Sequence, residues 1–117
     1  MPSKSPAQRL RDIIDNIDAI AAFTAGLEFT AFRTDRKTVY AVVRALEIVS
    51  EASRRLPGEL LERHPEIDWA AVAAAGNVYR HEYEVVDEAL IWHTVRHDLA
   101  ALRSIAALEF DRSQPAP

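Results

Sequence analysis

The chain has 117 residues, of which 49% are hydrophobic and 27% are charged, and its formal net charge is −4. This length and this balance are typical of one globular domain with its own core. The absence of cysteine excludes disulfides and thiolate metal sites, and it is usual in a reducing compartment. The acidic balance disfavours binding of nucleic acid by bulk attraction to phosphate, although it leaves room for a local basic cleft.

No stretch of the sequence has the roughly 20 consecutive apolar residues that a membrane-spanning helix needs. The opening residues 1–5 lack the apolar core of a secretory signal peptide and lead directly into a helical pattern. We therefore expect a cytoplasmic protein that makes no contact with membranes.

The first helix is predicted to begin at Pro6, because proline suits the first position of a helix and Ser5 precedes it. Apolar residues then recur every three or four positions, and this inward stripe consists of Leu10, Ile13, Ile14, Ile17 and Ala21. Gly26 is predicted to end the helix. Residues 24–34 are predicted to form a connection that holds a short helical turn.

A second long helix is predicted between Asp35, whose carboxylate can cap it, and the break at Pro57-Gly58. Its inward stripe consists of Val39, Val42, Val43, Leu46, Val49 and Ser53. Residues 59–64 can form one or two further turns before Pro65.

Asp68 is predicted to cap a third helix, which is rich in alanine and runs from Trp69 to about Val78. Residues 80–86 are ambiguous, since two neighbouring valines weaken the helical pattern. Asp87 is predicted to cap the last helix, whose inward residues are Ile91, Val95, Leu99, Leu102 and Ile105.

Four helices joined by short connections indicate an all-α fold, namely an up-and-down four-helix bundle with one or two short extra helices. We assign residues 1–112 to this domain and residues 113–117, which are polar and rich in proline, to a flexible tail.

Asn77, His81 and Tyr83 form the best candidate for a chemical site. Histidine is the residue most able to transfer a proton near neutral pH. Asn77 lies four residues earlier, on the same face of a continuous helix, and Tyr83 lies two residues later, on the same side of an extended or turn segment. The amide could orient a phosphate, the imidazole could transfer a proton and the phenol could be modified. The structural alternative is a helix end whose polar groups bond to backbone carbonyls.

The other three histidines favour structural interpretations. His64 precedes Pro65 at the end of a short helix, where a cation interacts well with the helix dipole. His93 and His97 share one helix face with a spacing that can bind a metal ion. A useful metal site needs a third ligand, and Asp98 points elsewhere, so we expect surface or interface histidines and no metal or cofactor.

A specific unit stands out between the third and the last predicted helix: the His-x-Tyr of residues 81–83, followed by an aspartate at the start of the next helix. The surrounding segment reads Ala75-Gly76-Asn77-Val78-Tyr79-Arg80-His81-Glu82-Tyr83, then Val86-Asp87 and Ile91-Trp92. This pattern resembles the C-terminal half of HepT-like proteins, which belong to the HEPN superfamily. Residues 10–14 and 45–52 are also similar to that family, so the resemblance covers about residues 10–109.

The resemblance implies a homodimeric four-helix-bundle toxin that cuts RNA without a metal ion. His81 would act in acid–base transfer, Asn77 would position the phosphate, and the strand would be broken by attack of its own 2′-hydroxyl. Tyr83 would be the residue to which a small partner nucleotidyltransferase, the antitoxin, attaches AMP.

One position departs from the family pattern, because the arginine that usually precedes the asparagine is replaced by Gly76. A phosphate-binding arginine forms bidentate, charge-assisted hydrogen bonds, so its loss is expected to weaken RNA binding and transition-state stabilisation. Arg80 and Arg44 are candidates to supply the missing charge, although Arg80 projects roughly 100° away from His81 on a helix.

Two hypotheses therefore remain open. The first is a HepT-like RNA endonuclease of a toxin–antitoxin pair, weakened by Gly76. The alternative is a non-catalytic module of the same fold that binds a minimal nucleotidyltransferase. The loss of the arginine favours the module, whereas the intact His81-Glu82-Tyr83 unit favours the enzyme.

Overall fold

The computed structural model describes residues 5–81 and 87–115, and of residues 76–81 it describes the backbone alone. Within these ranges the chain forms helices and connections, with no strand. The helices are α1 (Pro6–Thr24), α2 (Phe29–Thr34), α3 (Arg36–Arg54), α4 (Gly58–Glu62), α5 (Trp69–His81), α6 (Glu88–His97) and α7 (Leu99–Ser113). The prediction of an all-α bundle with short extra helices is confirmed, and the extra helices are α2 and α4.

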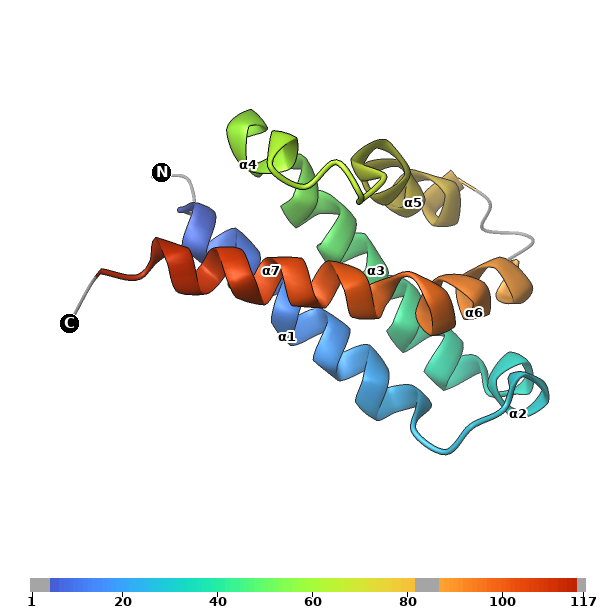
Figure 1. Cartoon of the computed structure of the whole chain (residues 1–117). Helices are drawn as coiled ribbons and strands as arrows, with labels where there is room; N and C mark the ends of the chain where they lie inside the picture. Colours follow the sequence, from blue (N-terminus) through green and yellow to red (C-terminus); the bar gives the residue numbers. More distant parts are fainter. Residues whose placement is uncertain (1–4, 82–86, 116–117) are drawn as a thin grey trace.

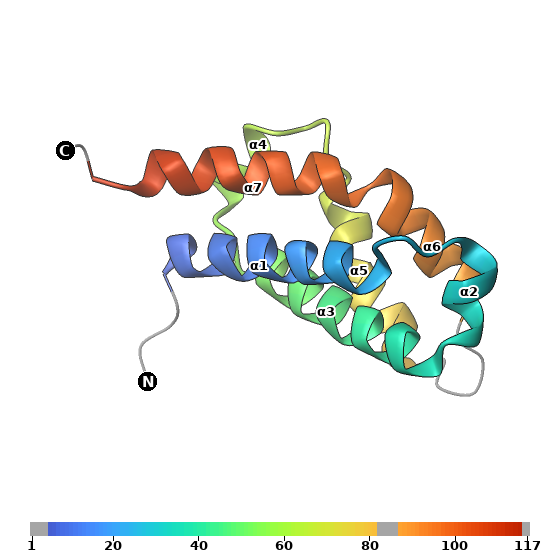
Figure 2. The same cartoon turned by 90° about the horizontal axis from the view of Figure 1, so that it is seen from below.

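Four long helical segments run alternately up and down (Figures 1 and 2). α1 packs against α3 and against α7, and α3 also packs against α5. α6 and α7 follow each other and together form the fourth segment. The short helix α2 closes one end of the bundle, where the ring of the buried Phe32 lies 4.9 Å from that of Trp92 in α6.

Local sequence signals explain where the helices begin and end. The three predicted caps, Asp35, Asp68 and Asp87, are confirmed, because each carboxylate accepts a hydrogen bond from the backbone N–H three residues later. Ser5, which was not predicted as a cap, accepts such a bond from the N–H of Gln8 at the start of α1. Gly26 follows the end of α1 with a φ of 75°, a left-handed conformation that glycine adopts without strain.

The core lies where the apolar stripes of α1, α3 and α7 meet, and the predicted stripes need corrections in three helices. In the last predicted helix, Val95 and Ile105 are only half-buried, and Ala106 is buried beside Ile105. Ala21 is exposed, and Ile20 and Thr24 are buried in its place. Val43 is only half-buried. No helix within the described ranges combines the length and the apolar character that crossing a membrane requires.

The prediction of one continuous last helix is wrong. Asp98, with a φ of −108°, separates α6 from α7. Neither proline nor glycine stands at this point, so no local signal marks the break. The change of direction allows α6 to pack on α2 while α7 packs on α1.

Candidate active site

The helix α5 carries three of the predicted site residues, namely Asn77, Arg80 and His81, and it is longer than the sequence indicated. Its backbone is helical as far as His81, beyond the predicted end at about Val78. Asn77 and His81 therefore lie one turn apart on a continuous helix, which is the backbone spacing that the predicted site requires. The side chains of both residues and the whole of Tyr83 lie outside the described residues, so their roles stay predictions.

A polar link holds α5 against α3. Ser50 Oγ donates a hydrogen bond to the carbonyl oxygen of Ala73 at 2.7 Å, and Arg54 Nη1 donates to the same oxygen at 3.2 Å. Ser50 is buried, with 1% of its surface exposed. Ala73 precedes Asn77 by one helical turn. The link therefore fixes how α3 approaches the part of α5 that carries the site.

Arg44 and Arg80, the two arginines predicted to supply a phosphate-binding charge, lie in different places. Arg44 pairs with Glu47 at 3.6 Å, and 72% of its side chain is exposed. Together with Arg9 and Asp12 of α1 it lines a hollow of about 210 Å³, which lies on the α1 side of α3. Arg80 lies in the last turn of α5, and its side chain is not among the described ones. The phosphate-binding role of either arginine remains untested.

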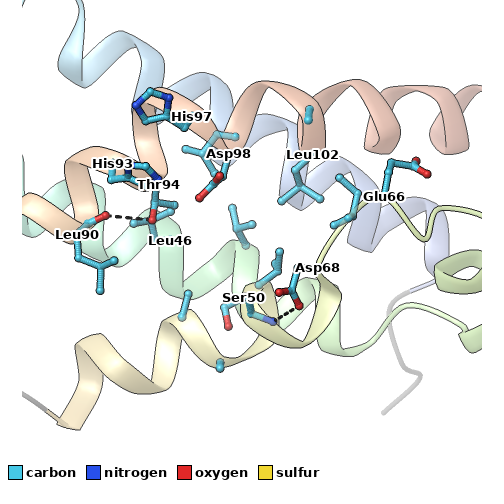
Figure 3. A pocket seen from close by; sticks show the side chains of 18 residues that line it. Leu46, Ser50, Glu66, Asp68, Leu90, His93, Thr94, His97, Asp98 and Leu102 are labelled. Atoms are coloured by element: carbon cyan, nitrogen blue, oxygen red, sulfur yellow. Dashed lines mark hydrogen bonds between the residues drawn. The ribbon is translucent and has the colours of Figure 1, made fainter.

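Beside α5 lies a groove of about 620 Å³ (Figure 3). Residues of α3, α5, α6 and α7 line it, and the described residues that α5 contributes include Ala75, directly before Gly76. Its apolar lining includes Leu46, Val49, Val72, Leu99 and Leu102. Ser50 and Asp68 lie on one side of the groove, and His93, His97 and Asp98 lie on the other (Figure 3).

The histidines outside α5 occupy two distinct environments. His93 and His97 are exposed as predicted, and their ring centroids lie 4.5 Å apart. In the part of the chain that the structure describes, no group of three or more His, Cys, Asp or Glu residues could hold a metal ion. His64 is buried, and its Nε2 atom lies 2.6 Å from Oε2 of Glu109 in α7.

Glu109 is the centre of a buried ionic cluster that sequence reasoning missed. Its carboxylate accepts two hydrogen bonds from Arg63, at 2.7 and 3.2 Å, and only 2% of its side chain is exposed. The hydrogen bonds from Arg63, together with that of His64, lower the pKa of Glu109 to about 2. The cluster joins the segment between α4 and α5 to α7. The sequence did contain one sign of this cluster. Glu109 lies seven residues, or about two helical turns, after the buried Leu102, so helical spacing places it on the face that points inward.

The fold and the site define a small helical-bundle protein with an asparagine and a histidine one turn apart at the end of its third long helix. The family described as “Ribonuclease HepT-like” matches residues 13–108. The chain belongs to this family of HepT-like ribonucleases, as the sequence resemblance predicted.

Individual relatives agree with this membership. “Probable ribonuclease HepT” of Thermococcus cleftensis is 39% identical over 100 residues, which cover 86% of this chain and 91% of the relative. “Putative RNase MJ1216” of Methanocaldococcus jannaschii is 30% identical over 103 residues, which cover 88% of this chain and 85% of the relative. No solved structure matches the chain with significant similarity.

Proposed function

We propose that this chain is a metal-independent RNA endonuclease that needs no cofactor and acts in the cytoplasm as the toxin of a toxin–antitoxin pair. The observation that carries the proposal is the match of residues 13–108 to the HepT-like ribonuclease family. The similar chains from other organisms also bear ribonuclease names. The continuous helix that sets Asn77 and His81 one turn apart supports it.

The proposed chemistry is attack of a ribose 2′-oxygen on the neighbouring phosphorus. The bond from phosphorus to the 5′-oxygen breaks, which leaves a 2′,3′-cyclic phosphate on one product and a 5′-hydroxyl on the other. His81 takes the proton from the 2′-hydroxyl or donates a proton to the departing 5′-oxygen. Asn77 positions the phosphate. Arg80 and Arg44 remain candidates for the positively charged residue that binds this phosphate.

A homodimer completes the proposed site. Two copies would bring their His81 segments to a shared cleft, so that one imidazole could act as the base and the other as the acid. The apolar groove beside α5 supports pairing, because large apolar openings on a surface commonly mark interaction sites. Leu90, with 44% of its surface exposed, lies in this groove.

Expression of the wild-type protein is expected to arrest bacterial growth, and His81→Ala is expected to relieve the arrest, because the acid–base group is lost. Growth curves after induction measure this. Tyr40→Ala is a control: it removes an exposed aromatic side chain of α3 that does not line the groove, and it should leave the protein toxic. Equal toxicity of the wild type and His81→Ala would overturn the nuclease proposal.

The proposed antitoxin is a cognate minimal nucleotidyltransferase that transfers AMP from ATP to the Tyr83 hydroxyl, with pyrophosphate as the leaving group. After co-expression with the neighbouring nucleotidyltransferase, mass spectrometry should find one adenylyl group on the peptide that contains Tyr83. Tyr83→Phe should abolish it, whereas Tyr40→Phe, on the exposed face of α3, should not. An unmodified Tyr83 peptide would contradict this role.

The second candidate function is a non-catalytic module that binds the nucleotidyltransferase, and Gly76 is the observation that favours it. This alternative predicts stable binding of the partner by both the wild type and His81→Ala, with no cleavage of RNA by either protein.

A further inference from the structure

Two arginines at the α2 end of the bundle lie over aromatic rings. The Cζ atom of Arg33 in α2 lies 5.7 Å from the ring centroid of Phe29, and that of Arg96 in α6 lies 5.0 Å from the ring centroid of Trp92. The centroids of Phe29 and Trp92 are 6.4 Å apart. The four side chains therefore form one row across the contact between α2 and α6, which we call the arginine–aromatic row (Figures 1 and 2).

Both guanidiniums of the row keep a positive charge at the surface. Arg33 and Arg96 are exposed, and neither forms an ion pair within the part of the chain that the structure describes. Arg11, near the opposite end of the bundle, also lies over a ring, but it pairs with Asp15 at 3.2 Å. The row therefore offers local positive charge in a chain whose net charge is −4, and such charge attracts anions.

A guanidinium that lies over a ring has two groups left for a ligand. Its contact with the ring holds it in one orientation, so the face turned away from the ring can stack on a nucleic-acid base. Its N–H groups at the edge can bind a phosphate in bidentate fashion. Single-stranded RNA offers unpaired bases and phosphates together, whereas an acidic peptide offers carboxylates alone. The row therefore matches single-stranded RNA better than an acidic peptide.

The row lies at the same end of the bundle as the candidate site. Ala73 of α5 meets Ser50 of α3, and the two helices run in opposite directions. From Ala73, the backbone of His81 lies about 12 Å further along α5, which is level with Val42 of α3. The first residue of α3, Arg36, lies about 9 Å beyond this level, and α2 packs against α3 directly after it in space. RNA that is bound at the row is therefore held at the end of the bundle where the proposed cleavage takes place.

We propose that the arginine–aromatic row binds single-stranded RNA, with a base stacked on the free face of each guanidinium and a phosphate at its N–H groups. This inference rests on the proposed function, because it assigns the row to the same RNA substrate. The row adds a binding site and no catalytic residue. Neither arginine replaces the one missing at position 76, which would contact the reacting phosphate.

The test is binding of a short single-stranded RNA whose 2′-hydroxyls are methylated, so that the strand cannot be cleaved by its own 2′-oxygen. Fluorescence anisotropy over a series of salt concentrations gives Kd and its salt dependence. Arg33→Gln and Arg96→Gln are each expected to raise Kd about tenfold, since a stacked base and a phosphate contact are lost. The slope of log Kd against log salt should fall by about 0.7 for each variant, the value for one lost phosphate contact on a single strand.

Arg11→Gln is the matched control, because it removes one arginine that lies over a ring but is neutralised by Asp15. It should change Kd less than about twofold. Arg96→Lys keeps the charge but loses the planar face, so it should keep the salt slope and raise Kd about threefold. It also covers the case in which Arg96→Gln does not fold. The same strand annealed to its complement should lose less affinity in Arg96→Gln than the single strand does, because its bases are already stacked.

Equal effects of Arg96→Gln and Arg11→Gln on Kd would overturn the inference, because bulk charge alone would then explain binding. Equal losses of affinity for the single strand and the duplex would also overturn it. Cleavage of unmodified RNA by the wild type and by His81→Ala tests the proposed function separately. A chain that cleaves no RNA but binds the strand through the row would refute the nuclease and keep the binding site.

Discussion

Glu109→Gln is expected to lower the free energy of unfolding by about 3 kcal/mol, the size of effect seen when one partner of a buried ion pair is removed. Glutamine keeps the shape of the side chain but loses the charge that faces Arg63 and the buried His64. A domain of this size is stable by about 5–15 kcal/mol in total. Tm should therefore fall by on the order of 10 °C.

Asp18→Asn is the matched control for Glu109→Gln. Asp18 also accepts two hydrogen bonds from one arginine, Arg103, at 2.6 and 3.1 Å, and this pair joins α1 to α7. Here 52% of the Asp18 side chain is exposed, so the pair is screened by water. Asp18→Asn should cost less than about 1 kcal/mol. Denaturation by urea measures the free energy of unfolding of both variants. Equal losses of this free energy would contradict the claim that burial makes the Glu109 ion pair the stronger one.

The same carboxylate makes stability depend on pH. The pKa of Glu109 is about 2 in the folded protein, against 4.5 as its ordinary value. Its ionised form therefore stabilises the fold above pH 4.5, and this contribution is lost as the pH falls toward 2. The difference between the two pKa values corresponds to about 3 kcal/mol. The free energy of unfolding should fall more steeply between pH 5 and pH 2 in the wild type than in Glu109→Gln, whereas parallel curves would contradict the assignment.

Gly76→Arg is expected to raise kcat/KM for RNA cleavage about hundredfold. One group that stabilises the charge of a transition state typically raises the rate by a factor of about 10²–10³, and the expected gain lies in this range. Position 76 lies directly before Asn77, and it is the position at which the sequence resemblance implies an arginine. Initial rates on a short RNA with fluorophore and quencher at its ends measure the effect.

Gly76→Ala controls for the effect of the helix itself. Glycine inside a helix is about 1 kcal/mol less favourable than alanine, so any residue other than proline or glycine at position 76 is expected to stabilise α5. Gly76→Ala should raise Tm without a large change in kcat/KM. If Gly76→Ala accelerates RNA cleavage as much as Gly76→Arg does, then the stability of α5, and not a missing charge, limits the cleavage rate of the wild type.

The candidate site was predictable in part. The sequence placed Asn77 and His81 four residues apart, and the backbone confirms that they share a continuous helix. It did not predict the contact of Arg54 with Ala73, which joins residues 19 positions apart. That contact depends on which face of α3 turns toward α5. Ser50 and Arg54, one turn apart on α3, were the available signal, but helical spacing alone does not tell which neighbour a face meets.

The fold followed from the sequence wherever its causes are local. A cap such as Asp35 or Asp87 acts on a backbone N–H three residues away, and an apolar stripe repeats within a single helix. The bend at Asp98 and the burial of Ile20 in place of Ala21 have a different cause, because they depend on how neighbouring helices pack. The pairing of His64 with Glu109, 45 residues apart, exists only once α4 and α7 have come together. The sequence by itself determined the caps and the order of the four long helical segments, and tertiary packing decided the break at Asp98 and which charged side chains meet.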